Sequence, residues 1–593
     1  MKITETFSAL DIHLAECLSR LSNNPSDSLR TAVKLVSAQT GKGNICLDLT
    51  TVAGCVVKEG PVEVLPSLEE LAEILLESGV VGRPGDNSPL ILDSPLLYLQ
   101  RYYQYEKAVS SFVLEKAERS MEGDPAGVGK VVGRLFPEEP GDDGINWQKV
   151  ASLVAFSGRL SVISGGPGTG KTTTVARLLA LCLEMAEKKE LKIMLAAPTG
   201  KAAARLQGAL VEAKEALPCS EELKERVIAE AMTVHRLLGR GRAGFKYNKE
   251  NPLSADIVVV DEASMVDLPL MARLMAAIPE KCRLILLGDR HQLASVQPGA
   301  VFGDLCQAAR AGFSHHFNRY ASSTGIVPLP VEENDRLADL YVELKQSYRF
   351  KEDSGIFAVS SAVKEGDGER ALALLKDKQF ADVRWQDLNE MEGEAFSAQV
   401  LARIQAHMKY VLDVSSPEEA LPRMNSFAVL CARRHGRLGV ENINSLAAAA
   451  LADNAIMSTD WYHGRPVMVR RNHHDRQLYN GDSGLFWGEN DEAGLIQVYF
   501  AIGSSIREFL PQQLPEHETA YAMTVHKSQG SEFEHVLLIL PDEQSQVVTS
   551  ELIYTALTRA RKSIEVWGSE AAFKDAVASK VLRRSGLVKA LSE

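Results

Sequence analysis

The segment GGPGTGKT at 165–172 has the residue types and spacing that bind phosphate groups. It fits the pattern G-x-x-x-x-G-K-[ST], follows the apolar run LSVIS and opens the helical stretch TTTVARLLALCLEMA. Glycine lets backbone N–H groups turn towards phosphate, and the N-terminus of the following helix adds positive potential. We expect Lys171 to reach the β- and γ-phosphates of a nucleoside triphosphate and Thr172 to ligate Mg²⁺. The expected nucleotide-binding residues of this segment are Gly165, Gly166, Pro167, Gly168, Thr169, Gly170, Lys171, Thr172 and Thr173.

A second segment, VVVDEAS at 258–264, ends an apolar run with two carboxylates. A charged group at the tip of a buried strand is costly unless it has a partner or a chemical role. We expect Asp261 to hold Mg²⁺, directly or through water, and Glu262 to polarise the attacking water. Together the two segments predict an Mg²⁺-dependent NTPase, but they do not say what hydrolysis drives.

Three later segments carry residues suited to the γ-phosphate. LLGDRHQL places Gln292 just beyond a third apolar run, where a γ-phosphate sensor would lie, while QSYRF and YTALTRARK contribute Arg349 and Arg559. The planar guanidinium suits charge that develops on a transferring phosphoryl group. Either arginine alone would be interpreted as a surface charge. Their assignment to the γ-phosphate rests on the order of the segments along the chain. The expected catalytic residues are Lys171, Glu262, Gln292, Arg349 and Arg559.

Short, continuously apolar runs must position these segments. Strands of this kind are usually buried on both faces of a parallel sheet, with helices between them. They fall into two sets, LSVIS, LKIMLAA, DIVVV and RLILL, then SFAVLCA, HVLLIL and SIEVW. The sequence therefore predicts the α/β class. The expected parts are a mainly helical N-terminal domain at 1–130, a linker rich in Pro, Gly and carboxylates at 131–145, two α/β domains at 146–350 and 351–593, and a small β-barrel-like insertion near 460–515.

The N-terminal domain carries none of the phosphate-binding segments. Its apolar periodicity is sufficient for folding, so it is not expected to be a disordered tail. SPLLYLQRYYQYEKAVSSFVLEKA, at 94–117, predicts one helix whose stripe of Tyr98, Tyr102 and Tyr105 faces the core. A folded unit without visible chemistry, attached to an enzyme, most economically serves as a docking surface.

Composition and charge are those of an ordinary globular protein. The chain has 593 residues, of which 45% are hydrophobic and 24% are charged, and its net charge is −13. This charge argues against binding nucleic acid by overall attraction, but it leaves room for a locally basic groove. The N-terminus lacks the apolar region of a signal peptide, and no run approaches the length of a membrane span. We expect a cytoplasmic protein.

The complete set of segments resembles the superfamily-one DNA helicases. In chain order, the matching segments are NWQKVA, GGPGTGKTT, APTGKAAARL, TVHRLLG, VVDEAS, GDRHQL, SYRF, TVHKSQGSEF and YTALTRAR. Within that group the chain is most similar to the RecD family, the alpha subunit of exonuclease V. GRPVMVRRN, YNGDSG and the N-terminal GNICLDL contribute to this similarity.

The resemblance implies two RecA-like P-loop domains that use ATP to move 5′→3′ along DNA and unwind it. It also implies a heterotrimer with RecB-like and RecC-like subunits that processes double-strand DNA ends for recombinational repair, with the RecC-like subunit docking on the N-terminal domain. The polarity comes from the resemblance alone. We see no carboxylate–lysine set typical of a nuclease, so we expect that activity in a partner. The alternative is a DNA-stimulated ATPase that acts as a switch or scaffold and unwinds little by itself.

The resemblance also assigns roles to single residues. Gln148 matches the position that reads adenine, Gly530 approaches the nucleotide and Glu532 its ribose. The positions that match contacts to the DNA strand are Pro198, Thr199, Thr233, His235, Thr524, His526 and Ser528. The segment at 239–253 predicts a hairpin carrying Phe245 and Tyr247. It is either a pin that separates strands at a fork or a plain surface hairpin.

Overall fold

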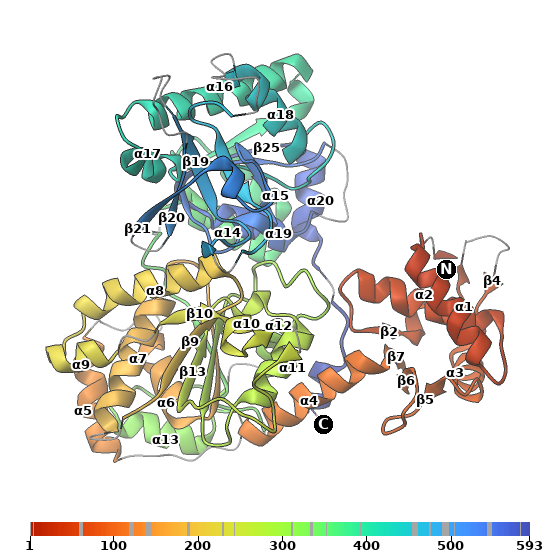
Figure 1. Cartoon of the computed structure of the whole chain (residues 1–593). Helices are drawn as coiled ribbons and strands as arrows, with labels where there is room; N and C mark the ends of the chain where they lie inside the picture. The colour runs from red at the N-terminus through yellow and green to blue at the C-terminus, as the bar shows by residue number, and fades with distance from the viewer. Residues whose placement is uncertain are drawn as a thin grey trace.

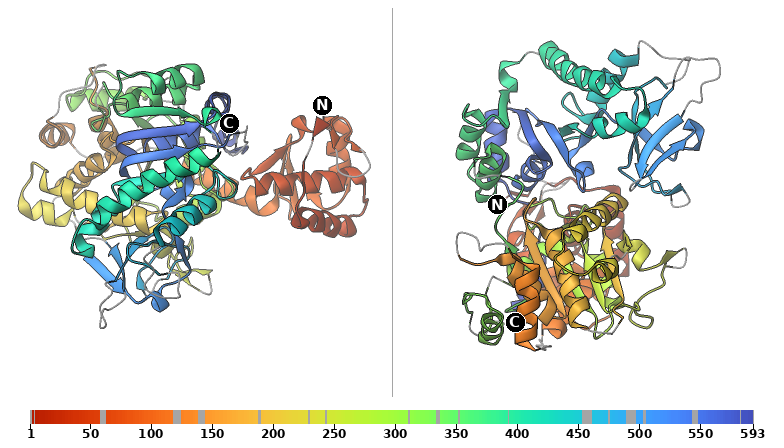
Figure 2. Two further views of the ribbon diagram at one scale, coloured as in Figure 1. Left: turned by 90° about the horizontal axis from the view of Figure 1, so that it is seen from above. Right: turned by 90° about the vertical axis from the view of Figure 1, so that its left-hand side faces the viewer.

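Three domains make up the chain, and the N-terminal domain stands to one side of two stacked α/β domains (Figures 1 and 2). The computed structural model describes residues 2–3, 5–57, 63–117, 124–137, 144–186, 190–227, 230–241, 244–309, 312–332, 336–350, 353–391, 393–452, 461–473, 476–488, 497–502, 505–542, 548–581 and 583–592. None of the helices in these ranges is long and apolar enough to cross a lipid bilayer.

The N-terminal domain packs three helices around a small mixed sheet of strand order β2-β7-β6-β5. Serine side chains cap the N-terminus of each helix, and their apolar faces enclose a separate core. Tyr98 lies on β7, so the prediction of one helix over 94–117 is wrong at its start. The elements are α1 (Ala9–Leu21), α2 (Asp27–Gly41), α3 (Leu68–Glu77), β2 (Cys46–Asp48), β5 (Val81–Gly82), β6 (Leu90–Asp93) and β7 (Leu96–Leu99).

Helix α4 (Gln100–Ala117) joins this domain to the first α/β domain. Val109 and Val113 are fully buried against α11 (Leu268–Ala277). The next helix, α5 (Pro125–Leu135), buries its valines in the core of the first α/β domain. Residues 131–135 of the expected linker are therefore helical and packed.

The first α/β domain is built on a six-stranded sheet of order β10-β9-β13-β14-β8-β15, in which every pairing is parallel. Apolar cores cover both faces, which explains why its strands read as apolar runs. The strands are β8 (Leu160–Gly165), β9 (Ile193–Ala197), β10 (Ala231–Thr233), β13 (Ile257–Val260), β14 (Arg283–Gly288) and β15 (Tyr341–Leu344).

The second α/β domain has a parallel sheet of order β16-β25-β24-β17-β23. The two parallel sheets confirm the predicted fold class. The insertion forms an antiparallel sheet of order β21-β20-β19-β18-β22, and among the described residues it keeps two unpaired edges, so a barrel is not confirmed. The strands are β16 (Val383–Asp387), β17 (Phe427–Cys431), β18 (Pro466–Val469), β19 (Ser483–Trp487), β20 (Gln497–Ile502), β21 (Ser505–Phe509), β22 (His517–Thr519), β23 (Ala522–Thr524), β24 (Phe533–Ile539) and β25 (Ala560–Gly568).

The C-terminal tail, described at residues 579–581 and 583–592, returns from the second α/β domain to the other two domains (Figure 1). It follows α20 (Glu570–Ala578) and ends in α21 (Leu587–Ser592), which packs on α4 and on α12 (Val301–Ala308). The backbone N–H of Arg584 donates to Asn44 Oδ1 at 2.8 Å, and the backbone N–H of Ile45 donates to the Arg584 carbonyl at 2.8 Å. The tail therefore ties all three domains together, which the sequence did not predict.

Candidate active site

The phosphate-binding loop lies between β8 and α7 (Lys171–Met185). Gly168 and Gly170 both have a φ of 77°, a left-handed conformation that favours glycine. The Lys171 ammonium is folded into the loop and donates to the Gly165 carbonyl at 2.6 Å and the Gly166 carbonyl at 3.3 Å. Thr172 and Thr173 occupy the first turn of α7 and are partly exposed. The loop is thus preformed, with its lysine at the phosphate-facing side of the turn.

The two carboxylates follow β13 directly. Glu262 has a φ of 51°, and its backbone N–H donates to Asp261 Oδ1 at 2.9 Å. A left-handed non-glycine residue is strained, and such strain often marks a functional site. Burial, and then the neighbouring Glu262 charge, raise the pKa of Asp261 to about 6, although Lys171 lowers it.

These oxygen donors fit Mg²⁺. A divalent cation beside Asp261 would offset the burial and repulsion that raise its pKa, and Mg²⁺ is commonly held by one or two protein ligands plus substrate phosphates. Thr172 is the second residue of α7 and follows Lys171, whose charge acts on Asp261. In the described ranges, no group of three or more His, Cys, Asp or Glu side chains could hold a metal ion without such phosphates.

Arg559 joins the two α/β domains at the site. It is the second residue after α19 (Ser550–Leu557), and only 2% of it is exposed. Its guanidinium donates to Gln292 Oε1 at 3.0 Å, the Ser531 carbonyl at 3.1 Å and the Thr555 carbonyl at 3.2 Å. The structure thus brings together two expected catalytic residues from different domains.

Glu532 lies at the centre of three arginines. Arg349 and Arg561 each approach it at 2.8 Å, and Arg205 of α8 (Gly200–Glu215) forms a third ion pair with it. Burial alone would raise the pKa of Glu532, but the charges of Arg205 and Arg349 and hydrogen bonds from Arg349 and Arg561 lower it to about 2. One N–H group of Arg349, at Nη1, is buried without a hydrogen-bond partner in the described residues. The Nη1 group of Arg349 can therefore donate a hydrogen bond to a further anionic partner.

The segment around Arg349 covers the phosphate-binding loop. The Tyr348 backbone N–H donates to the Gly168 carbonyl at 2.8 Å, and Ser347 Oγ donates to the Pro167 carbonyl at 3.4 Å. Gln148 also approaches the loop, since its amide Nε2 donates to the Thr169 carbonyl at 3.1 Å. Gln148, an expected nucleotide contact, therefore touches the loop itself.

The expected DNA-contacting residues lie at the ends of matching strands. Ala-Met-Thr-Val-His occurs at 231–235 and again at 522–526, at the ends of the edge strands β10 and β23. In both copies the threonine Oγ caps the next helical turn, accepting from the backbone N–H of Arg236 at 3.2 Å and of Lys527 at 3.3 Å. The repeat is present in the sequence itself, but its five residues alone did not predict a shared local structure. It shows that the two α/β domains present the same local structure.

The other expected DNA-contacting residues differ in how exposed their side chains are. Pro198 and Thr199 precede α8, where Thr199 Oγ accepts from the Ala202 backbone N–H at 3.1 Å. His235 and His526 are half-buried, and burial lowers the pKa of each. Ser528 is fully buried and donates to the Val525 carbonyl at 2.7 Å, so its hydroxyl does not face a groove in this structure.

Gly530 is buried at the contact between the two α/β domains. It has a φ of 75°, and a Cβ added to it would lie 3.5 Å from the Ala202 side chain in α8. The loop that follows β23 therefore reaches both the Thr199 end of the first domain and, through Glu532, the phosphate-binding side.

The expected hairpin consists of β11 (Arg240–Gly241) and β12 (Gly244–Phe245). The Arg273 guanidinium lies 4.9 Å from the Phe245 ring centroid, and the His235 ring lies 6.0 Å from it. Phe245 and Tyr247 are partly buried against the first α/β domain. These rings lie at the base of the hairpin.

Tyr479 of the insertion was not among the expected site residues. Its ring lies 2.6 Å from the position that a Cβ on Gly200 would take, and with Thr233 it lines a cavity of about 420 Å³. The quoted segment YNGDSG contained this tyrosine, but nothing in the sequence showed that the insertion touches the first domain.

Three family models match parts of the chain. They are the RecBCD enzyme subunit RecD N-terminal domain over residues 4–98, an AAA domain over 148–298 and a UvrD-like helicase C-terminal domain over 519–564. The match at 4–98 ends at the junction of β7 and α4.

Curated relatives match most of the chain. RecBCD enzyme subunit RecD of Haemophilus influenzae is 36% identical over 85% of this chain and 82% of its own length. The same subunit of Mycolicibacterium smegmatis is 36% identical over 100% of this chain and 99% of its own length. A solved structure of Bacteroides Pif1 bound to single-stranded DNA is 18% identical, covers 71% of this chain and 91% of that chain, and gives a TM-score of 0.38.

The two parallel sheets, the phosphate-binding loop and the arginines across the cleft define an ATP-dependent DNA helicase. The similarity of this chain to the curated RecD proteins extends over all three domains. The chain belongs to the RecD family.

Proposed function

We propose that this protein is the 5′→3′ translocating helicase subunit of a RecBCD-type complex that processes double-strand DNA ends in the cytoplasm. The observation that carries the proposal is the contact between Arg559 and Gln292, supported by the Arg349–Glu532 pair. These contacts join the two α/β domains beside the phosphate-binding loop. Hydrolysis there would change how the domains sit against each other.

Each site residue has a role in this proposal. Lys171, Arg349 and Arg559 offset charge on the phosphates, and Glu262 polarises the attacking water. Thr172 and Asp261 hold Mg²⁺, which neutralises charge on the β- and γ-phosphates when bound. Gln148 reads the base, while Gly530 and Glu532 approach the nucleotide from the second domain. Once ATP binds, the free N–H of Arg349 is available for the γ-phosphate.

The repeated Thr-Val-His segments supply the grip on DNA. A capped helical turn at the end of a strand presents backbone N–H groups, which suit a phosphodiester. One copy lies on each α/β domain, at Thr233 and Thr524. A change in the distance between the domains would therefore move one gripping point relative to the other along the strand.

The N-terminal domain is the proposed docking surface for a RecC-like subunit. Its first helix presents Leu10 and Leu21, which are 72% and 65% exposed, with Leu14 and Cys17 between them at helical spacing. An exposed apolar stripe on an otherwise well-packed domain indicates a protein interface. A RecB-like subunit completes the proposed heterotrimer.

The test measures ATPase activity with and without single-stranded DNA, and the unwinding of forks with a 5′ or a 3′ tail. We expect DNA to stimulate ATP hydrolysis and the 5′-tailed fork to be unwound. Stimulated hydrolysis without unwinding, both alone and with the partner subunits, would favour a DNA-responsive switch instead. Hydrolysis that does not respond to DNA would contradict both.

A further inference from the structure

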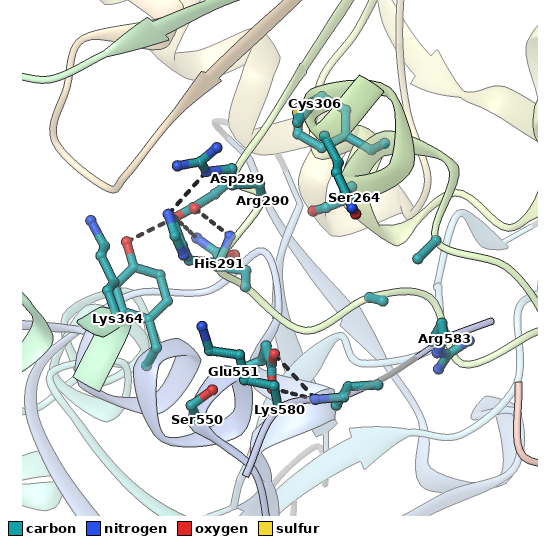
Figure 3. Close-up of a pocket in the computed structure, with 18 of the residues that line it drawn as sticks. Ser264, Asp289, Arg290, His291, Cys306, Lys364, Ser550, Glu551, Lys580 and Arg583 are labelled. Carbon is teal, nitrogen blue, oxygen red and sulfur yellow. Dashed lines mark hydrogen bonds between the residues drawn. The ribbon is translucent and has the colours of Figure 1, made fainter. Parts of the chain in front are cut away.

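A cavity of about 470 Å³ lies between the two α/β domains, beside the phosphate-binding loop. The loop after β14 and helix α12 form one wall, while α14 (Gly355–Glu365), α19 and the C-terminal tail form the other. Figure 3 shows Ser264 and Arg290 on the first side and Lys364 and Lys580 on the second. We call it the interdomain cavity.

Two side chains that line the interdomain cavity also approach the phosphate-binding loop. The Tyr554 hydroxyl lies 3.0 Å, and the Lys364 ammonium 3.7 Å, from the position that a Cβ on Gly166 would take. The same hydroxyl donates to Asp289 Oδ2 at 2.9 Å. The interdomain cavity therefore adjoins the phosphate-binding loop at Tyr554 and Lys364.

The lining supplies hydrogen-bond donors that have no partner in the described part of the chain. Ser264 Oγ, on a residue that is 7% exposed, and Arg583 Nε are both buried and unsatisfied. Lys364 and Lys580 add two ammonium groups to the lining. Unpaired buried donors are costly, so they indicate a ligand that accepts hydrogen bonds.

We propose that the interdomain cavity receives the inorganic phosphate released by ATP cleavage and conducts it to solvent. The inference rests on the proposed hydrolysis of ATP at the adjoining loop. The donors and ammonium groups match a tetrahedral oxyanion, and the cavity begins where the γ-phosphate would be released. DNA phosphodiester offers the same chemistry, but none of the expected DNA-contacting residues lines the cavity.

Gly303 allows the route to be blocked without touching the catalytic residues. It lines the cavity from α12, and a Cβ added to it would meet no atom within 4 Å. Gly303→Leu should therefore narrow the cavity, while Gly303→Ala is the matched control. Using the full chain with single-stranded DNA, quenched-flow measures ATP cleavage and a fluorescent phosphate-binding protein measures phosphate release. We expect Gly303→Leu to leave cleavage unchanged and to slow release by roughly tenfold or more, which is a barrier change of at least about 1.4 kcal/mol.

A second variant tests the charge. Lys580→Gln should weaken inhibition of the ATPase by added inorganic phosphate several-fold, because it removes an ammonium from the lining. Lys409→Gln, an exposed lysine on α16 (Gly393–Leu412) outside the cavity, should have no effect. Because Lys580 is exposed, its replacement keeps the test valid if Gly303→Leu does not fold.

Three results would overturn the inference. Wild-type phosphate release from folded Gly303→Leu would show that phosphate leaves another way. Altered DNA affinity of this variant with normal phosphate release would assign the cavity to DNA. Phosphate inhibition that is unchanged in Lys580→Gln would remove the charge argument. Failure of the wild-type chain to cleave ATP would instead defeat the proposed function itself.

Discussion

At the scale of single residues, Glu532 shows how the site is held together without nucleotide. Its carboxylate forms ion pairs with Arg205 from the first domain, Arg561 from the second and Arg349 from the segment between them. The motif match predicted that Glu532 and Arg349 would serve the nucleotide, but not that they would pair with each other. Motif positions name residues one at a time, so the pairing required coordinates.

Lys171→Gln removes the charge that faces the β- and γ-phosphates. The neutral glutamine side chain should still allow the loop to form. Loss of one such electrostatic group typically costs about 10²–10³ in rate. We expect ATPase activity on single-stranded DNA to fall by that order while the thermal unfolding midpoint stays near the wild-type value. Near-normal turnover by a folded Lys171→Gln protein would remove the basis of the phosphate-loop assignment.

Glu532→Gln should destabilise the chain in a pH-dependent way. The folded-state pKa is depressed from 4.5 to about 2, so the stabilisation is present above the unfolded value and is lost as pH falls through the folded one. The shift corresponds to about 3 kcal/mol of unfolding free energy near neutral pH. Urea unfolding of both proteins should show a constant difference from about pH 7 to pH 5, which narrows between about pH 4.5 and pH 2. Equal stability near neutral pH would contradict the arginine cluster.

At the scale of elements, the sequence predicted the parallel strands well because strands buried on both faces read as uninterrupted apolar runs. It failed where such a run passes into a helix without a break. Between β7 and α4 the chain reads LLYLQRYY, with no Gly, Pro or capping residue, so the strand containing Tyr98 was assigned to the helix. The insertion alternated as expected, but its closure depends on pairing between strands distant in the sequence.

The β11–β12 hairpin gives the prediction at this scale. Phe245→Ala together with Tyr247→Ala should lower fork unwinding more than the ATPase activity stimulated by single-stranded DNA, if the hairpin acts at the fork. Because Phe245 stacks near Arg273, some loss of stability is also expected. Tyr410→Ala, an exposed aromatic on α16 that is 51% accessible, is the control. Equal loss of both activities would mean that these rings support the first α/β domain instead.

At the scale of the whole molecule, the N-terminal domain shares part of its packing with the first α/β domain. Helix α4 packs on α11, and Ile45 and Tyr98 share the core of the first α/β domain. Removal of residues 1–120 would strip apolar cover from the core of the first α/β domain. A surface change on α1 is the cleaner experiment.

Leu10→Glu with Leu21→Glu should abolish co-purification with partner subunits, because an interface of standard size buries at least about 1,200 Å² around apolar anchors. ATPase activity stimulated by single-stranded DNA should persist, since neither residue contacts the α/β domains. Val211→Glu, which alters a residue on α8 that is 44% exposed, is the matched control. Normal assembly of the α1 variant would place the partner surface on another domain.

The C-terminal tail also limits how the cleft can open. The chain crosses between the α/β domains once between β15 and α14 and again between α20 and α21. The second crossing is held at its far end by hydrogen bonds of Arg584 and Gly586 to Asn44 and Glu106. A domain attached at two separate points rotates about the axis that joins those points. Each opening would then carry the second domain along one fixed arc, so the length of a movement along DNA would be set by geometry.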